Sequence, residues 1–147
     1  MLLVRAFDLL PTEAVPLFTG LSAGRPHAEG ADSPVVTDLA DLVGAIHRDS
    51  FFARVDGTSM TGAGIYPGDV VVVDFRREAR SGDVVVAVVD GQTTLKRYVE
   101  RGTNGETRRV LLPEGEGEDP ILLGRAAEAE LLGVVTWTLK PHRSGRP

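Results

Sequence analysis

Two valine-rich runs, VVVVD at 70–74 and VVVAVV at 84–89, limit the folds open to this chain more than any other feature. β-Branched residues favour strands, and a run without polar alternation indicates a strand that is buried on both faces. Five further short runs, bounded by Gly, Pro and Asp, predict strands over 51–56, 93–100, 108–113, 120–124 and 131–139. The sequence therefore predicts a mainly β domain, with a curled and mostly antiparallel sheet or barrel.

Turn signals predict how some of these strands pair. The Asp90-Gly91 pair between two apolar runs is a strong signal for a two-residue hairpin, and GTNGE at 102–106 predicts a second turn. The first hairpin places the strand over 93–100, which contains Lys96, beside the valine run at 84–89. Burial of Lys96 against these valines would supply the desolvation that a neutral lysine requires.

The first fifty residues have a different character. Residues 11–34 contain four prolines and three glycines and show no sustained periodicity, which predicts an extended, flexible arm over 1–36. TDLADLVGAI then predicts a short helix over 38–47, with Thr37 or Asp38 as its N-cap. We expect a single folded domain over 37–140 and a disordered basic tail over 141–147.

Composition excludes several functional classes. The chain has a net charge of −5, which disfavours direct DNA binding through phosphates. It has no cysteine and three scattered histidines, so we expect no disulfide, no metal site and no cofactor. No apolar run is long enough to span a bilayer or to form a signal-peptide core, so we expect a cytoplasmic protein without a membrane anchor.

Ser59, in the stretch VDGTSMTGAGIYPGD at 55–69, is a candidate nucleophile. The glycines end the preceding strand, and Ser59 can cap a single helical turn, which places it at a strand-to-helix junction. Free N–H groups at such a junction can stabilise an oxyanion. The alternative is that Ser59 is only a cap, because a serine hydroxyl needs a nearby base to act as a nucleophile.

Lys96 is the candidate base. The chain has fourteen arginines and only two lysines, Lys96 and Lys140, and a lysine can lose its proton when it is buried whereas an arginine cannot. The alternative is an ordinary lysine at the rim of the sheet, with its ammonium in water.

VDGTSM, YPGDVVVVD, SGDVVVAVVDGQTTLKRYV and LLGVVTWTLK, in this order over residues 51–140, resemble the catalytic domain of the LexA and UmuD family of self-cleaving serine–lysine peptidases. The resemblance implies that Ser59 is the nucleophile and Lys96 the general base. It also implies that the backbone N–H groups of Thr58 and Ser59 stabilise the oxyanion. The loop PEGEGEDPI departs from the family pattern, with Gly115 and Glu118 in place of an asparagine and an aromatic residue.

The segment before the core resembles the short arm of the UmuD branch, and we expect no DNA-reading domain ahead of it. Cleavage in the family implies Ala23-Gly24 as the bond cut, and small residues on a proline-rich tether suit intramolecular attack. The resemblance further implies a homodimer, stimulation by a RecA–single-stranded DNA filament, and service to a Y-family translesion polymerase in SOS mutagenesis. The alternatives are a catalytically idle adaptor of the same fold and a regulator such as an antirepressor.

Overall fold

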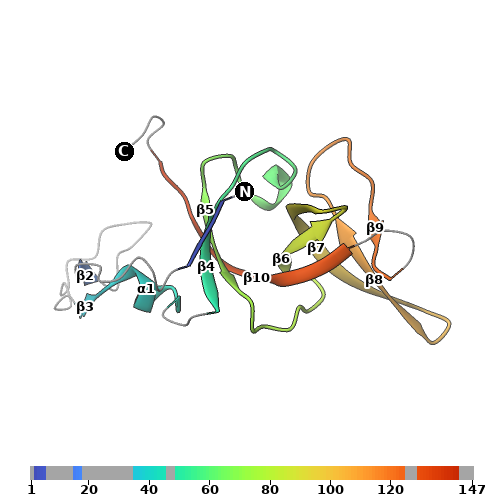
Figure 1. The fold of residues 1–147 in the computed structure, drawn as a ribbon, viewed down its shortest axis with the longest axis horizontal. Coiled ribbons are helices and arrows are strands. Elements are labelled where there is room, and N and C mark those ends of the chain that lie inside the picture. Colours follow the sequence, from blue (N-terminus) through green and yellow to red (C-terminus); the bar gives the residue numbers. More distant parts are fainter. Residues whose placement is uncertain (1, 6–14, 18–34, 46–48, 125–128, 143–147) are drawn as a thin grey trace, which may run out of the picture.

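The computed structural model describes residues 2–5, 15–17, 35–45, 49–124 and 129–142 of the chain. Its main feature is an eight-stranded antiparallel sheet with the strand order β1-β4-β5-β10-β6-β7-β8-β9 (Figure 1). The strands of this sheet are β1 (Leu2–Arg5), β4 (Ser50–Arg54), β5 (Val70–Asp74), β6 (Val84–Val89), β7 (Gln92–Thr103), β8 (Glu106–Leu112), β9 (Ile121–Leu122) and β10 (Ala129–Leu139). A separate pair consists of β2 (Val15–Leu17) and β3 (Val35–Thr37).

The mainly β, antiparallel prediction is confirmed. Each of the seven runs read as a strand corresponds to one of the strands β4 to β10. The sheet does not close into a barrel, because β1 and β9 form two separate edges of it in the described part of the chain. The sequence analysis did not predict β1, which pairs with β4 at one of those edges.

Both predicted hairpins are present. Asp90 and Asn104 have positive φ angles of 49° and 52°, and each is followed by a glycine that also has a positive φ. Two successive left-handed residues are the requirement of a type I′ turn, whose twist matches that of paired strands. The first turn sets the register of β6 and β7, in which Lys96 lies opposite Val85.

The helix α1 is shorter than predicted and spans Leu39–Leu42. Asp38 is its N-cap, as expected, and its Oδ1 accepts a hydrogen bond of 2.8 Å from Asp41 N. Gly44, with a φ of 67°, follows the C-cap and takes the backbone out of the helix. The predicted helix extended to residue 47, and this was wrong for residues 43–45, which are not helical. Residues 46–48 lie outside the described residues.

The long strand β10 pairs with β5 on one side and with β6 on the other, which joins the two ends of the sheet (Figure 1). Its register shifts twice, between Leu131 and Gly133 and between Val135 and Trp137. At Gly133 a Cβ atom would lie 2.9 Å from the carbonyl oxygen of Asp74, so the close approach of the two strands requires glycine there. Such bulges bend a strand, and they allow β10 to follow the curvature of the sheet.

The valine runs are buried on both faces, as predicted. Val71, Val73 and Val86 share one apolar cluster with Met60 and Ile65 from the segment after β4. A second cluster, which includes Val85, Leu111 and Val134, lies between β6, β8 and β10. The first cluster anchors the segment around Ser59 to the sheet.

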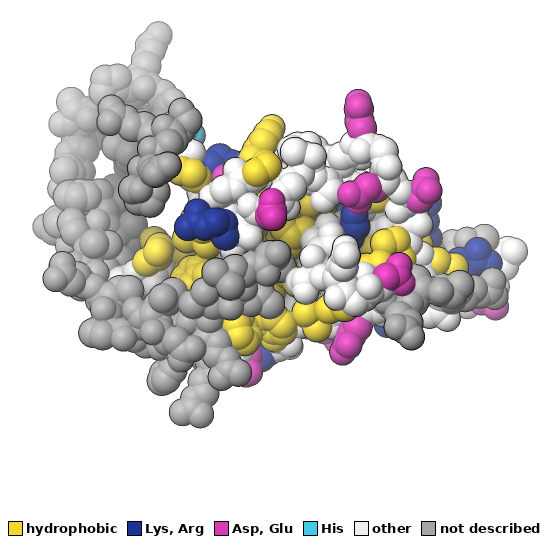
Figure 2. Space-filling model, turned by 45° about the horizontal axis from the view of Figure 1, so that its top comes forward, with side chains coloured by type: hydrophobic (Ala, Val, Ile, Leu, Met, Phe, Trp, Pro, Cys, Tyr) yellow, Lys and Arg dark blue, Asp and Glu magenta, His cyan; other side chains and the backbone are white. Residues whose placement is uncertain are grey.

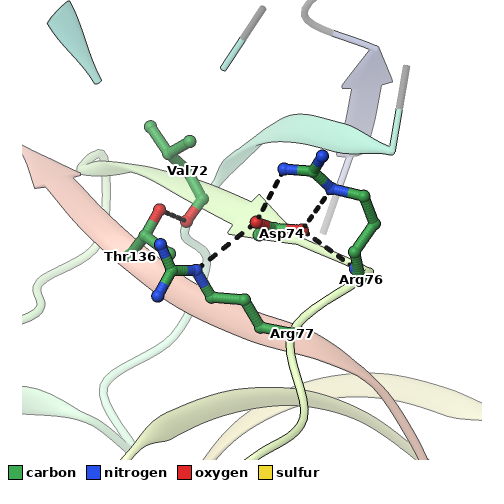
Figure 3. Close-up of polar contacts among 5 residues, drawn as sticks. All are labelled: Val72, Asp74, Arg76, Arg77 and Thr136. Atoms are coloured by element: carbon green, nitrogen blue, oxygen red, sulfur yellow. Dashed lines mark hydrogen bonds and ion pairs between the residues drawn. The ribbon is translucent and has the colours of Figure 1, made fainter. Parts of the chain in front are cut away.

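The end of β5 is fixed by a charged group of residues (Figure 3). The carboxylate of Asp74 accepts hydrogen bonds from Arg76 N and Arg76 Nε and forms an ion pair with Arg77 Nε at 3.4 Å. Burial opposes ionisation of Asp74, but the hydrogen bonds from Arg76 outweigh it and lower the pKa of Asp74 below its usual value. Thr136 Oγ1 donates a hydrogen bond of 3.4 Å to Val72 O. This bond connects β10 to β5 at the register shift between Val135 and Trp137.

On the face shown in Figure 2, acidic and basic side chains are interspersed among hydrophobic and uncharged ones over the described residues. No helix in the described part of the chain has the length and apolar character of a membrane span. The same residues contain no group of three or more histidine, aspartate or glutamate side chains arranged to hold a metal ion.

Candidate active site

Ser59 lies in the turn between β4 and a 3₁₀ helix, η2 (Thr61–Ala63). The side chain of Met60, the next residue, is almost fully buried in the first apolar cluster and holds this turn against the sheet. Met60 occupies the N-cap position of η2, and no side chain caps the helix. The prediction that Ser59 is an N-cap was therefore wrong, although it does lie between a strand and a helical turn. The partly buried Ser59 side chain is not committed to a capping bond.

The Lys96 side chain is buried and does not lie at the rim of the sheet, which was the alternative left open by the sequence. It is only 5% exposed, and it lies on β7 opposite Val85, which is fully buried. Lys96 Nζ forms a hydrogen bond and ion pair with Glu118 Oε2. Within the described residues the polar contact of Lys96 is with Glu118 and not with Ser59.

A cavity of about 180 Å³ lies between the Ser59 turn and the start of β7. Ser59 lines it from one side, and Leu95, the residue before Lys96, lines it from the other. The remaining lining residues are Val55, Asp56, Gly57, Met60, Thr93 and Thr94. The nucleophile candidate therefore faces a recess whose opposite wall belongs to the strand of the base candidate.

The loop after β8 connects the two candidates. Glu114 N donates to Ser59 O at 2.9 Å, and Gly62 N donates to Glu114 O at 2.7 Å. Four residues after Glu114, the side chain of Glu118 reaches Lys96. This loop, residues 113–118, contacts the turn of Ser59 at one end and the amine of Lys96 at the other.

Gly115 fits this loop tightly against the turn. A Cβ atom at residue 115 would lie 3.1 Å from both Ser59 Cα and Thr58 O, which is closer than side-chain carbons normally approach. The departure of Gly115 from the family asparagine thus has a local physical basis, because a side chain would push the loop away from Ser59.

An ion pair on β7 supports the same loop. Arg97 Nε lies 2.6 Å from Glu114 Oε1, and Arg97 Nη1 donates a hydrogen bond of 2.8 Å to Gly82 O. The side chain of Arg97 is 28% exposed and that of Glu114 is 30% exposed. Arg97 therefore links the loop to the turn before β6, one residue away from Lys96.

The two predicted oxyanion donors lie in the same turn. The carbonyl of Thr58 accepts a hydrogen bond of 3.2 Å from Thr61 N. The N–H groups of Thr58 and Ser59 donate no hydrogen bond to any described residue. Ser59 lines the cavity and Thr58 is not among its lining residues, so the role of these two N–H groups as oxyanion donors stays a prediction.

The predicted cleavage site, Ala23-Gly24, lies outside the described residues. Sequence reasoning singled out Glu118 as a departure from the family pattern but did not predict its contact with Lys96. The other lysine, Lys140, also pairs with a carboxylate, that of the buried Asp69. Burial opposes ionisation of Asp69, but hydrogen bonds from Lys140 and from Tyr66 N outweigh it and lower the pKa of Asp69.

Comparison with known proteins identifies the family. The profile of the Peptidase S24-like family matches residues 16–136, which is most of the chain. This chain belongs to that family. The match includes the Ser59 turn, β7 with Lys96, and the loop over 113–118.

Several proteins similar to this chain have the name LexA repressor. The chain is 30% identical over 146 residues to a LexA repressor of Carboxydothermus hydrogenoformans, covering 94% of this chain and 68% of the relative. It is 32% identical to a LexA repressor of Syntrophobacter fumaroxidans, covering 95% and 66%, and 35% identical to one of Geotalea uraniireducens, covering 84% and 59%. The chain therefore spans 59% to 68% of the length of these relatives.

Proposed function

We propose that this family member is a self-cleaving serine peptidase in which Ser59 is the nucleophile and Lys96 the general base. Support comes from the burial of Lys96 on a strand that forms one wall of the Ser59 cavity. A buried lysine is costly to keep charged, and a neutral amine is the form that can accept a proton from serine.

The proposed reaction is hydrolysis of the Ala23-Gly24 peptide bond. Ser59 Oγ gives its proton to the neutral Lys96 amine and attacks the carbonyl carbon of Ala23. The N–H groups of Thr58 and Ser59 stabilise the oxyanion. The bond to Gly24 then breaks, the Gly24 amine takes the proton from Lys96, and water hydrolyses the ester on Ser59. For this sequence to occur, Lys96 must turn from Glu118 toward Ser59.

Self-cleavage suits this arrangement because the substrate bond belongs to the same chain. Joining the two reacting groups in one molecule raises their effective concentration and can offset an indifferent cleft. We propose that a RecA–single-stranded DNA filament promotes the reaction. The trimmed product would then act as a homodimer beside a Y-family translesion polymerase in SOS mutagenesis, as in the UmuD branch.

The names of the relatives favour a second candidate. LexA repressors regulate by repression, and this chain matches 68% of the first of them. In that case cleavage by Ser59 would control a repressor or its partner in place of a polymerase. A pull-down with the parent chain before and after self-cleavage separates the two candidates, because one predicts a polymerase bound to the trimmed product and the other a bound repressor.

The test of the peptidase is intact-mass analysis of the full chain after incubation at alkaline pH, with and without a RecA filament. Ser59→Ala and Lys96→Ala chains are incubated beside it. We expect the parent alone to give two fragments, 1–23 and 24–147, whose masses sum to that of the parent plus one water. An unchanged mass under all conditions would support an idle adaptor of the same fold. Cleavage of the Ser59→Ala chain would exclude Ser59 as the nucleophile.

A further inference from the structure

We propose that Glu118 is a brake on the peptidase, which holds the Lys96 amine away from Ser59 until the loop over 113–118 releases it. This inference rests on the proposed function of Ser59 and Lys96. Glu118 acts through Lys96, so it is a positioning residue and not one that contacts the substrate.

The ion pair is asymmetric in its exposure. The Lys96 side chain is 5% exposed, whereas the Glu118 side chain is 47% exposed. A hydrogen bond between two charged side chains is stronger than one between neutral groups, so it fixes the direction of the Lys96 amine. The position of that amine therefore depends on whether Glu118 is in place.

The loop can release Glu118 without unfolding the sheet. Its first part is held by the Glu114 backbone bonds to the Ser59 turn and by the ion pair with Arg97. Its second part is exposed and contains Gly117, which has a φ of 89° and open space where a Cβ would lie. The side chain of Glu118 is the polar link between this exposed part and β7.

Other charged groups around Lys96 do not replace Glu118. β6, which pairs with β7 at this position, consists of valines and one alanine and contains no titratable side chain. Arg97 and Glu114 are paired with each other. Asp56 is exposed and lines the cavity on the side of Ser59.

Release of Glu118 would then remove the carboxylate partner of the Lys96 amine. The amine is then free to turn toward Ser59, as the proposed reaction requires. A partner that binds the exposed acidic loop, or that displaces Glu118 with its own charge, would switch the peptidase on.

The test is the rate of self-cleavage at neutral pH in the full chain carrying Glu118→Gln, measured by intact mass beside the parent. We expect Glu118→Gln to be cleaved at least about ten-fold faster than the parent, because a neutral amide holds the amine less strongly than a carboxylate does. Glu116→Gln is the matched control, because it removes the same charge from an exposed position of the same loop. A Glu118→Gln chain that is cleaved at the rate of the parent, or more slowly, would overturn the brake.

A second measurement does not depend on cleavage. With only two lysines, a chain labelled with carbon-13 lysine gives one Cε signal from Lys96 and one from Lys140. In the Ser59→Ala background, we expect Glu118→Gln to change the chemical shift of the Lys96 signal and to leave the Lys140 signal unchanged. An unmoved Lys96 signal overturns the brake even if the protein cleaves itself. Absence of cleavage in every variant refutes the proposed function and, with it, the brake on that activity, while the signals still report whether Glu118 contacts Lys96.

Discussion

The asymmetric ion pair leads to a quantitative prediction for Lys96→Met. Methionine keeps the aliphatic length of the side chain and removes the buried ammonium, whose desolvation costs several kcal/mol. Its former partner, Glu118, is 47% exposed and can be solvated. The hydrogen bond that is lost, one to a charged group, contributes about 1.5–3 kcal/mol. We expect a net stabilisation of about 1–3 kcal/mol, or about 2–4 °C in Tm for each kcal/mol.

Lys140→Met is the matched control, because the exposures are reversed. The Lys140 side chain is 37% exposed, whereas that of its partner Asp69 is 4% exposed. Removing Lys140 leaves a buried carboxylate with one hydrogen bond, from Tyr66 N, and should destabilise the fold by about 1–3 kcal/mol.

Both substitutions are measured by urea unfolding followed by circular dichroism, in the Ser59→Ala background so that no chain cleaves itself. Opposite signs for the two lysines are the expected result. A loss of more than about 1 kcal/mol in Lys96→Met would refute the reasoning, since it would show that Lys96 is retained for stability. In that case the main physical reason for assigning it a chemical role would disappear.

Three further predictions concern stability. The pKa of Asp69 is lowered on folding. Asp69 therefore contributes to the free energy of unfolding above its usual pKa, and this contribution is lost as the pH falls through the pKa of the folded state. Burial raises the pKa of Tyr98 to about 12, so its contribution is present below its usual value of 10.0 and is lost as the pH rises through about 12. In a plot of Tm against pH, Asp69→Asn should weaken the fall of Tm at acid pH, and Tyr98→Phe should weaken its fall at alkaline pH. A pH dependence of Tm equal to that of the parent would contradict these assignments. Gly62→Ala would place a Cβ atom 2.2 Å from the carbonyl oxygen of Glu114, so we expect a loss of at least about 2 kcal/mol in urea unfolding, and a stability equal to the parent would contradict that contact.

The strands could be predicted from sequence because their signals are local. Runs of valine indicate buried strands, and the Asp90-Gly91 and Asn104-Gly105 pairs define turns whose geometry requires residues with positive φ. These two signals together place Lys96 opposite Val85. The sequence left open whether Lys96 is buried or lies at the rim, because strand pairing alone does not determine which face of the sheet a side chain is on.

Contacts between distant segments could not be predicted in the same way. Nothing local in residues 2–5 indicates that this segment pairs with β4, which is about fifty residues away. Glu118 lies 22 residues after Lys96 in a run of acidic and glycine residues, and such a run is usually a solvated loop. The position of Ser59 before the helical turn was correct in outline, but its capping role depended on backbone geometry that places Met60 at the cap.

The most direct test of the central claim, that Lys96 acts as a base, is the self-cleavage rate of Lys96→Arg measured by intact mass beside the parent. Arginine keeps the positive charge and can still pair with Glu118, but it cannot lose its proton to become a base. Circular dichroism of both chains checks that the substitution preserves the fold. We predict that the parent is cleaved between Ala23 and Gly24 and that the Lys96→Arg chain remains intact at every pH. Cleavage of the Lys96→Arg chain at the rate of the parent would contradict the account.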